Sequence, residues 1–309
     1  MTLDFINVGY GDAILIRSGS FTMLVDCGDW TVGDGGPDSQ RISAADFLRQ
    51  EGIDTLDLLV LTHLHRDHSG GLAKLLECVA VRSFRCNYLP DRIFWGKRVP
   101  VPEEFSAGAR CLLESLNVFL SALAIMEQQG TEVSLASPGT WPLTPELTAE
   151  CFLEAQPIFE RQAAIWQNVL EDRADNRELE ELDGFINNTS IRLRLSYAGQ
   201  EIELPGDVYA SCWERHQLPP CTLIKLPHHG HGDALTSRLL EMLRPRYAVI
   251  SVSDDRTDDC PSKKIIQLLS QFGVECFFTD AVPCQYAPDQ PHVAIRFRIE
   301  KGVLMVSDV

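Results

Sequence analysis

The chain lacks the signals of a membrane or secreted protein. Its longest apolar helical segment, 112–125, contains the polar residues Glu114, Ser115, Asn117 and Ser121, so no apolar stretch is long enough to span a bilayer. The first residues, 1–5, have no basic start, and a strand-like pattern follows at once. We therefore expect a cytoplasmic protein that makes no contact with a membrane.

Paired cysteine motifs and basic residues are also scarce. The ten cysteines include no C-x-x-C pair, which is typical of reduced thiols in a core rather than of a disulfide framework. Lysine and arginine number 27 against 44 acidic residues, giving a net charge of −17. Such a protein repels phosphate backbones at long range, so extensive nonspecific binding of nucleic acid by this chain alone is disfavoured.

The sequence offers no familiar covalent nucleophile, since it has no G-x-S-x-G motif and no P-loop lysine. What it does have is T-H-L-H-R-D-H-S-G-G at 62–71, with three of the eight histidines. Imidazole and carboxylate bind zinc and manganese at neutral pH, and four of them fall within six positions here. The stretch follows an apolar run at 56–61 that reads as a buried strand, so we expect a metal site at a strand end.

This short segment can start two adjacent metal sites. On a turn after the strand, His63 and His65 point the same way, whereas Asp67 and His68 lie one step further along.

Two later clusters also follow predicted strands. Asp207 comes after the strand at 200–204 and a glycine, a place where a lone aspartate more often caps a turn. His228, His229 and His231 follow the strand at 223–226, and three imidazoles in four residues indicate contact with a metal or a phosphate. Together the clusters predict ligands for two ions, with Asp207 bridging: His63, His65, Asp67, His68, Asp207 and His229.

Strand and helix patterns alternate in both halves of the chain. We expect one α/β domain over 1–309, with two β-sheets packed face to face and helices outside. Residues 88–184 interrupt this pattern as a mostly helical insertion, with helices at 103–129 and 157–182 and a strand at 147–155. The insertion contains no histidine, so its expected roles are covering the site, shaping substrate access, docking a protein partner or stabilising the fold.

The ordered motifs, including Asp26, Asn188-Thr189-Ser190, Gly206-Asp207 and His228-His229-Gly230, resemble the metallo-β-lactamase superfamily. V-G-Y-G-D-A at 8–13, L-V-D-C-G at 24–28 and K-L-P-H-H-G at 225–230 resemble its ComEC-like branch. The resemblance implies an αββα sandwich with two metal ions at the rim between the sheets.

The resemblance also implies a role for each site residue. His63, His65 and Asp207 would hold the first ion, and Asp67, His68, Asp207 and His229 the second. Asp26 and Asn188 would support the ligands from behind, and His228 would face the substrate. Asp67, Asp207 and His228 are therefore the expected catalytic residues.

The sequence departs from the family pattern at two places. Many members have a further histidine about twenty residues before the bridging aspartate, where this chain has Asn187-Asn188, as in the ComEC-like branch. The first ion would then have fewer protein ligands and more water, which favours manganese over zinc. The chain also has Asp259-Cys260-Pro261 where ComEC-like chains carry His-Pro.

These features predict a metal-dependent hydrolase, foremost a phosphodiesterase or nuclease that uses two divalent ions, zinc or manganese, to activate water. If the substrate is nucleic acid, a partner protein would help to hold it. One alternative is a hydrolase of a small ester, lactone, lactam or phosphocholine-type diester, which suits the acidic surface better. Another is a subunit of a larger assembly, such as a bacterial defence effector, that a partner activates.

Overall fold

The first half of the chain and its last two strands build an eight-stranded mixed sheet. In the computed structural model, which describes residues 1–33, 39–154, 156–252, 260–280 and 292–309, its strands in order are β15 (Val303–Asp308), β14 (Ala294–Glu300), β1 (Thr2–Ile6), β2 (Ile14–Ser18), β3 (Phe21–Val25), β4 (Thr55–Leu61), β5 (Ala80–Cys86) and β6 (Glu132–Leu135). β1 to β3 form the predicted antiparallel meander, and β3 to β6 run parallel. β14 returns from the end of the chain to pair with β1.

The second half of the chain supplies most of a seven-stranded sheet. Its strands in order are β13 (Glu275–Phe278), β12 (Tyr247–Ile250), β11 (Leu223–Lys225), β10 (Gln200–Leu204), β9 (Arg192–Tyr197), β8 (Leu147–Phe152) and β7 (Gly139–Pro142). β9 and β10 form the predicted hairpin, with Tyr197 opposite Gln200. β10 to β13 run parallel, so the carboxyl ends of β10 and β11 lie at the same edge of the sheet.

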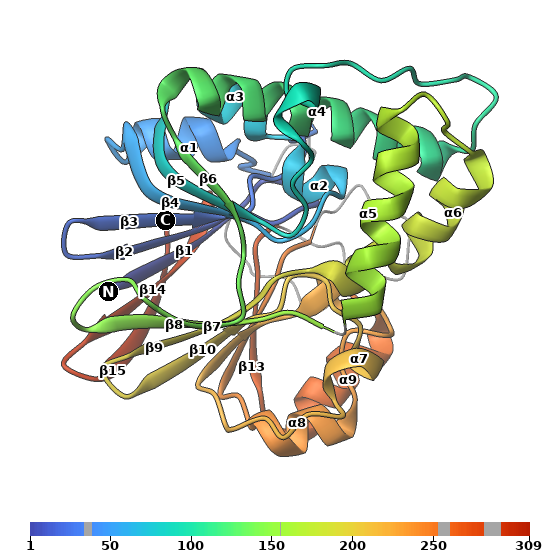
Figure 1. Ribbon diagram of the computed structural model, residues 1–309. Coiled ribbons are helices and arrows are strands. Elements are labelled where there is room, and N and C mark those ends of the chain that lie inside the picture. Colours follow the sequence, from blue (N-terminus) through green and yellow to red (C-terminus); the bar gives the residue numbers. More distant parts are fainter. Residues whose placement is uncertain (34–38, 155, 253–259, 281–291) are drawn as a thin grey trace.

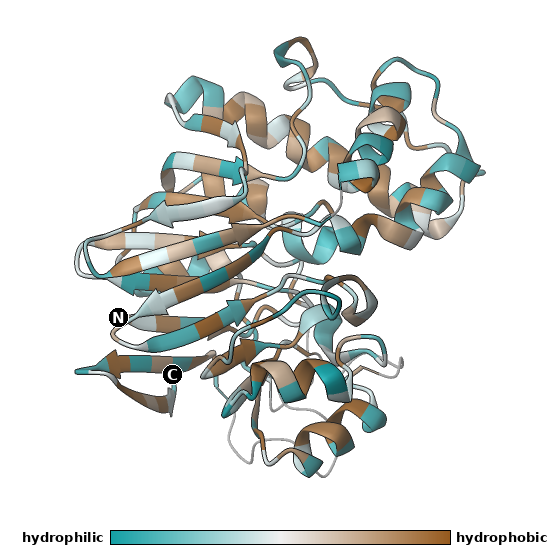
Figure 2. Ribbon diagram, turned by 60° about the horizontal axis from the view of Figure 1, so that its bottom comes forward, coloured by the Kyte–Doolittle hydropathy of each residue, from teal (hydrophilic) through white to brown (hydrophobic). Residues whose placement is uncertain are grey.

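The two sheets bury an apolar layer between them. In β9, Leu193 and Leu195 enter this layer, while Arg192 and Arg194 point to the other face of the sheet. Phe5 and Phe297 pack edge to face, with ring centroids 5.8 Å apart. Each large side chain buried here contributes roughly 1.5–3 kcal/mol. Figure 2 shows the resulting alternation of hydrophobic and hydrophilic residues along the strands.

Helices cover the outer face of each sheet, which confirms the predicted αββα sandwich (Figure 1). The first sheet carries α1 (Ala44–Gln50), α3 (Leu72–Leu76) and α4 (Ala107–Gln129), and the second carries α7 (Ala210–Trp213), α8 (Ser237–Leu243) and α9 (Lys263–Gln271). α5 (Gln156–Leu170) and α6 (Asn176–Phe185) stand at one end of the sandwich. The short helices α2 (Arg66–Ser69), η1 (Arg92–Phe94), η2 (Ile186–Thr189) and η3 (Pro227–Gly230) lie in the connections.

The long helix α4 is packed into the core. Ser106 caps it, because its Oγ accepts a hydrogen bond from Ala109 N, so the helix begins at Ala107 rather than at 103. Among the described residues it is the one helix long and apolar enough to cross a bilayer, but Leu116, Phe119 and Leu123 are fully buried in the fold. Its apolar character is therefore explained by packing.

The range 88–184 is less uniformly helical than predicted. The helix expected at 157–182 is two helices, because Asp172 takes a φ of +59° and the Asp175 side chain accepts from Arg177 N to start α6. The same range contains β6, β7 and β8, which extend both sheets. The division into one domain with an insertion stays a prediction.

Candidate metal centre

The ligand-type residues meet at one rim of the sandwich, at the carboxyl ends of strands from both sheets. Asp26 directly follows β3, and the histidine-rich turn after β4 leads into α2. Asp207 follows β10, and His228 and His229 follow β11 in η3. Residues far apart in the sequence come together because these strand ends lie at the same rim.

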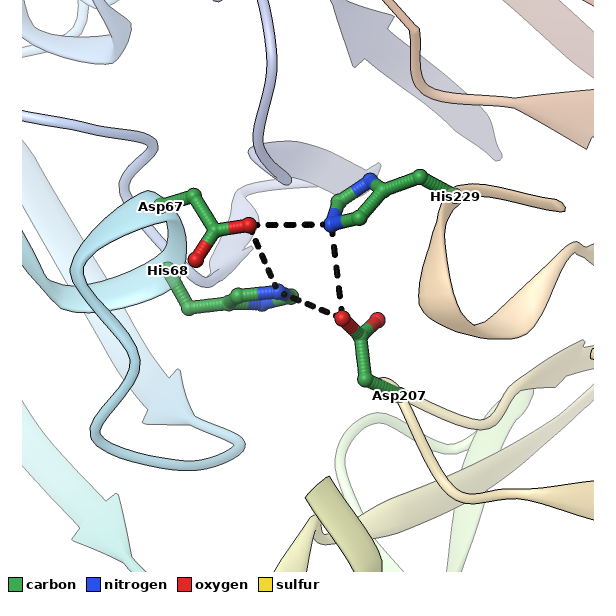
Figure 3. A group of neighbouring side chains, drawn as sticks. All are labelled: Asp67, His68, Asp207 and His229. Carbon is green, nitrogen blue, oxygen red and sulfur yellow. Dashed lines mark hydrogen bonds and ion pairs between the residues drawn. The ribbon is translucent and has the colours of Figure 1, made fainter. Parts of the chain in front are cut away.

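Four of the predicted ligands converge on one point (Figure 3): Asp67, His68, Asp207 and His229. His229 Nε2 lies 3.1 Å from Asp67 Oδ2 and 3.3 Å from Asp207 Oδ2. His68 Nε2 lies 3.2 Å from Asp207 Oδ2. Two ligand atoms, each about 2.1 Å from a tetrahedral ion, are about 3.4 Å apart, so this spacing fits a divalent cation.

Hydrogen bonds from behind aim both imidazoles at that point. His68 Nδ1 lies 2.8 Å from Asp26 Oδ2, and Asp26 in turn accepts from Thr62 N and Thr62 Oγ1, both at 2.7 Å. His229 Nδ1 lies 3.1 Å from the carbonyl oxygen of Ser251, which only accepts, so Nδ1 carries the proton. The Nε2 atoms are the ones available to an ion, and Asp26 orients the ring of His68 through Nδ1.

Asp207 is held through one oxygen and presents the other. Its Oδ1 accepts from His228 N at 3.0 Å and from Lys225 Nζ at 3.2 Å, while Oδ2 faces the two imidazoles. Lys225 is fully buried and also pairs with the buried Asp12. Oδ2 is therefore the oxygen of Asp207 that would be available to a metal ion.

Asp12 and Lys225 have no role in the prediction from the sequence, although both fall inside the motifs at 8–13 and 225–230. The sequence does contain one sign of this ion pair, a lysine in the otherwise apolar stretch 223–226. A lysine that is buried in such a strand requires a charged partner.

The four converging side chains also balance one another's charge. Burial alone would lower the pKa of His229, but the carboxylates Asp207 and Asp67 raise it to about 9. Burial would raise the pKa of Asp67, but His68 and His229 hold it well below its usual range. Without an ion, protonated imidazoles offset the negative charge of the carboxylates. A divalent ion that binds at this point would therefore displace protons from the imidazoles.

The residues predicted for the first ion lie beside this group. His63 is fully buried; its Nδ1 lies 3.1 Å from Thr62 Oγ1 and 3.3 Å from Ser190 Oγ. Its Nε2 is buried and has no hydrogen-bond partner among the described residues, which is costly unless an ion binds there. Burial and the nearby histidines hold the pKa of His63 well below its usual value, so its ring is in the neutral form that a metal ligand requires.

His65 completes the pair predicted for the first ion. It stands at the start of α2, its ring centroid 5.0 Å from that of His63, and its Nε2 lies 3.4 Å from Asp183 Oδ1.

His228 and Asn188 take different places from the ligands. His228 Nδ1 lies 2.8 Å from Asp233 Oδ1, and its ring stacks on His231 at 4.4 Å between centroids. Asn188 contacts no ligand side chain in the described hydrogen bonds; its Oδ1 accepts from Tyr209 N at 3.0 Å. Tyr209 packs beside His228, so Asn188 supports the loop next to His228 rather than a predicted ligand.

The segment that replaces His-Pro is described only in part. Cys260 Sγ donates to the carbonyl oxygen of His229 at 2.9 Å, whereas Asp259 lies outside the described residues.

An αββα sandwich with a histidine and aspartate cluster at its rim defines a class of metal-dependent hydrolases. The family model described as the metallo-beta-lactamase superfamily matches residues 6–253, and the chain belongs to this superfamily. The candidate ion-binding group lies within the matched range.

Individual relatives are distant. The ComE operon protein 3 of Bacillus subtilis is 21% identical over 90% of this chain, which spans only 32% of that protein's length. The metallo-beta-lactamase fold protein YhfI of Bacillus subtilis is 12% identical, with a TM-score of 0.50, 90% of this chain and 96% of that chain covered. An isothiocyanate hydrolase from Delia radicum gut bacteria is 13% identical at a TM-score of 0.47, with the same coverage of 90% and 96%. Membership of the ComEC-like branch stays a prediction.

Proposed function

We propose that the chain is a metal-dependent phosphodiesterase or nuclease that acts with two divalent ions, zinc or manganese. The observation that carries this proposal is the convergence of Asp67, His68, Asp207 and His229 beside the unpartnered Nε2 of His63. The proposed ligands are those predicted from the sequence: His63, His65, Asp67, His68, Asp207 and His229.

Two bound ions would supply hydroxide from water at neutral pH and offset charge on the leaving oxygen. The protein's own contribution is to hold its ligands still. Asp26 fixes the ring of His68, and Ser251 fixes that of His229. Lys225 and His228 N hold Oδ1 of Asp207, so that Oδ2 stays directed at the imidazoles.

The rim beside the ligands suits an anionic group rich in oxygen. His228 is partly exposed there, with Nδ1 held by Asp233, so its Nε2 edge is free to contact a phosphoryl oxygen. The Tyr10 ring packs against His229 at 4.3 Å between centroids, and its hydroxyl lies 3.5 Å from His231 Nε2. Imidazole and phenol donors at one rim favour a phosphodiester over an uncharged ester.

The direct test is loss of hydrolysis in variants of Asp67 and Asp207. Asp67→Ala and Asp207→Ala should abolish metal-dependent cleavage of bis-p-nitrophenyl phosphate, and Asp67→Asn and Asp207→Asn repeat the test with the side-chain shape kept. Asp308→Ala, at an exposed place on the edge strand β15, is the control and should cleave as the wild type does. Circular dichroism checks the fold, and full activity in the folded Asp67 and Asp207 variants would end the proposal.

The net charge of −17 favours a second candidate, hydrolysis of a small ester, lactone, lactam or phosphocholine-type diester. Side-by-side assays of bis-p-nitrophenyl phosphate, single-stranded DNA, RNA and a chromogenic lactam separate the two candidates. Activity that needs a co-purified protein would instead support an effector subunit, with the helices of 88–184 as the proposed docking surface.

A further inference from the structure

Tyr209 lies beside the candidate metal centre, on the same short connection between β10 and α7 that carries Asp207. Val208 stands between the two and is fully buried in the apolar cluster under the helices of the second sheet. The ring of Tyr209 packs beside that of His228, with the centroids 5.2 Å apart. The backbone N of His228 donates to Asp207 Oδ1 at 3.0 Å, so these three residues are joined by direct contacts at the rim.

Two consecutive asparagines hold Tyr209 at both of its ends. Asn188 Oδ1 accepts from the backbone N of Tyr209 at 3.0 Å, and Asn187 Nδ2 donates to its hydroxyl oxygen at 3.1 Å. Both asparagines belong to η2, which directly precedes Ser190, and Ser190 Oγ lies 3.3 Å from His63 Nδ1. The phenol ring is therefore fixed between η3 and the segment that contacts His63.

The contact with Asn187 leaves the hydroxyl of Tyr209 with a proton to donate. A phenol is protonated at neutral pH and can both donate and accept, and this one accepts from the Asn187 amide. No acceptor for its own proton occurs among the hydrogen bonds of the described residues. Tyr209 and His228 are both partly exposed, so the pair is accessible from solvent.

We propose that the Tyr209 hydroxyl donates a hydrogen bond to a non-bridging phosphoryl oxygen of the substrate, beside Nε2 of His228; this rests on the proposed function. Asp233 holds His228 through Nδ1 at 2.8 Å, as Asn187 holds the hydroxyl. During phosphoryl transfer, charge is spread over the non-bridging oxygens, and donors fixed in place before the reaction stabilise it without reorganisation. The proton stays on Tyr209 throughout, and Asn187 is a positioning residue.

A simpler role for Tyr209 is to pack against His228 and stabilise the rim. Tyr209→Phe separates the two roles, since it keeps the ring and removes only the hydroxyl. Asn187→Ala removes the amide that holds the hydroxyl. If Asn187 acts through the hydroxyl, this change should lower kcat in the wild type and cause no further loss in a Tyr209→Phe background. Tyr197→Phe is the matched control, because its hydroxyl donates to Glu146 at 3.3 Å on the exposed surface.

The experiment combines three measurements on protein equilibrated with Mn²⁺: metal content, steady-state cleavage of bis-p-nitrophenyl phosphate, and calorimetric titration with inorganic phosphate. Tyr209→Phe should hold as much metal as the wild type, with kcat lower and phosphate bound more weakly, each by about tenfold or more. Tyr197→Phe should match the wild type in all three.

Unchanged kcat and phosphate affinity in a folded Tyr209→Phe would overturn the assignment and leave the proposed function standing. Loss of metal in Tyr209→Phe would also overturn it, because the hydroxyl would then support the ion site instead. If Tyr209→Phe does not fold, Asn187→Ala takes its place under the same criteria. A wild type that binds metal and phosphate but cleaves no phosphodiester would overturn the proposed function alone, and the phosphate titration would still decide the contact. A wild type that binds neither metal nor phosphate would overturn both.

Discussion

At the level of single residues, the candidate metal centre contains a positive charge of its own, the ammonium group of Lys225. Lys225 is fully buried, and its ammonium lies between the carboxylates of Asp12 and Asp207. Burial would lower its pKa, but these two carboxylates raise it above its usual value. The lysine therefore stays charged and offsets part of the negative charge of the ligand set when no ion is bound.

Lys225→Met should destabilise the metal-free protein, since it leaves two buried carboxylates without their nearest cation. Removing one partner of a buried ion pair costs about 3–5 kcal/mol. Urea unfolding in the presence of a chelator measures this loss. Lys74→Met is the control, because Lys74 is half exposed, pairs with Asp46 on the surface and should cost less than about 1 kcal/mol. Equal stability of Lys225→Met and the wild type would contradict this role.

His229 makes the stability of the metal-free protein depend on pH. Its pKa is about 9 in the folded protein, above the ordinary value of 6.5, because Asp207 and Asp67 outweigh the effect of burial. The stabilisation by its protonated ring is complete below pH 6.5 and is lost as the pH rises toward 9. Chemical unfolding with chelator at pH 6.5 and pH 9 should show this loss, and His229→Gln should lose less. An identical decline in His229→Gln would show that other groups cause it.

At the scale of elements, the loop between β1 and β2 positions α2. Asp12 N donates to the carbonyl oxygen of Asp67 at 3.1 Å, so the loop packs directly on the residue that carries a ligand. Gly11 has a φ of +146°, and an added Cβ would collide with the same carbonyl oxygen. A glycine is therefore required where the loop approaches α2.

Gly11→Ala should displace Asp67 and weaken metal binding at the second site at least tenfold. Gly19→Ala is the matched control, since Gly19 also has a positive φ but no atom within 4 Å of an added Cβ. The control should cost roughly 1–2 kcal/mol of stability and leave metal affinity unchanged. Calorimetric titration with Mn²⁺ measures both variants, and unchanged affinity in a folded Gly11→Ala would show that the loop does not position the ligand.

Local sequence patterns predict most of the strands and the clusters of histidine and aspartate residues at the strand ends. The meander of β1 to β3 and the hairpin of β9 and β10 show in alternating side chains and turn residues. The break between α5 and α6 depends on a positive φ at Asp172, and its signal in the sequence is Asp175, a capping residue type that stands three positions before Glu178. The pairing of Lys225 with Asp12 joins residues 213 positions apart, and no local pattern reports such a contact.

At the scale of the whole molecule, the site exists only when both sheets have packed. Strand ends of the first sheet supply His63, His65, Asp67 and His68, and those of the second supply Asp207 and His229. Figure 1 shows α5 and α6 at one end of the same sandwich, and Asp183 of α6 lies 3.4 Å from His65, measured from Oδ1 to Nε2. The two sheets and the helical end of the molecule thus meet at one rim.

The overall charge of −17 should limit the use of long nucleic acids by the isolated chain. At equal concentration of phosphodiester bonds, we expect cleavage of bis-p-nitrophenyl phosphate to be faster than cleavage of single-stranded DNA. We also expect DNA binding by the inactive Asp67→Asn variant to be weaker than about 100 μM at physiological salt, the weak end of nonspecific binding. Submicromolar binding that falls steeply with salt would instead reveal a basic surface strong enough to outweigh the net charge.

The proposed centre would hold two divalent ions with unequal affinity, and the metal content of the protein measures this directly. Metal content of the wild-type chain, by elemental analysis after equilibration with Mn²⁺ or Zn²⁺ and stepwise dialysis, should fall from two ions to one before the last is lost. His63→Ala should remove the ion that leaves first, and His229→Ala the ion that leaves last. A folded wild-type chain that retains no metal under these conditions, or that loses both ions together in every variant, would show that the rim does not hold two ions of unequal affinity.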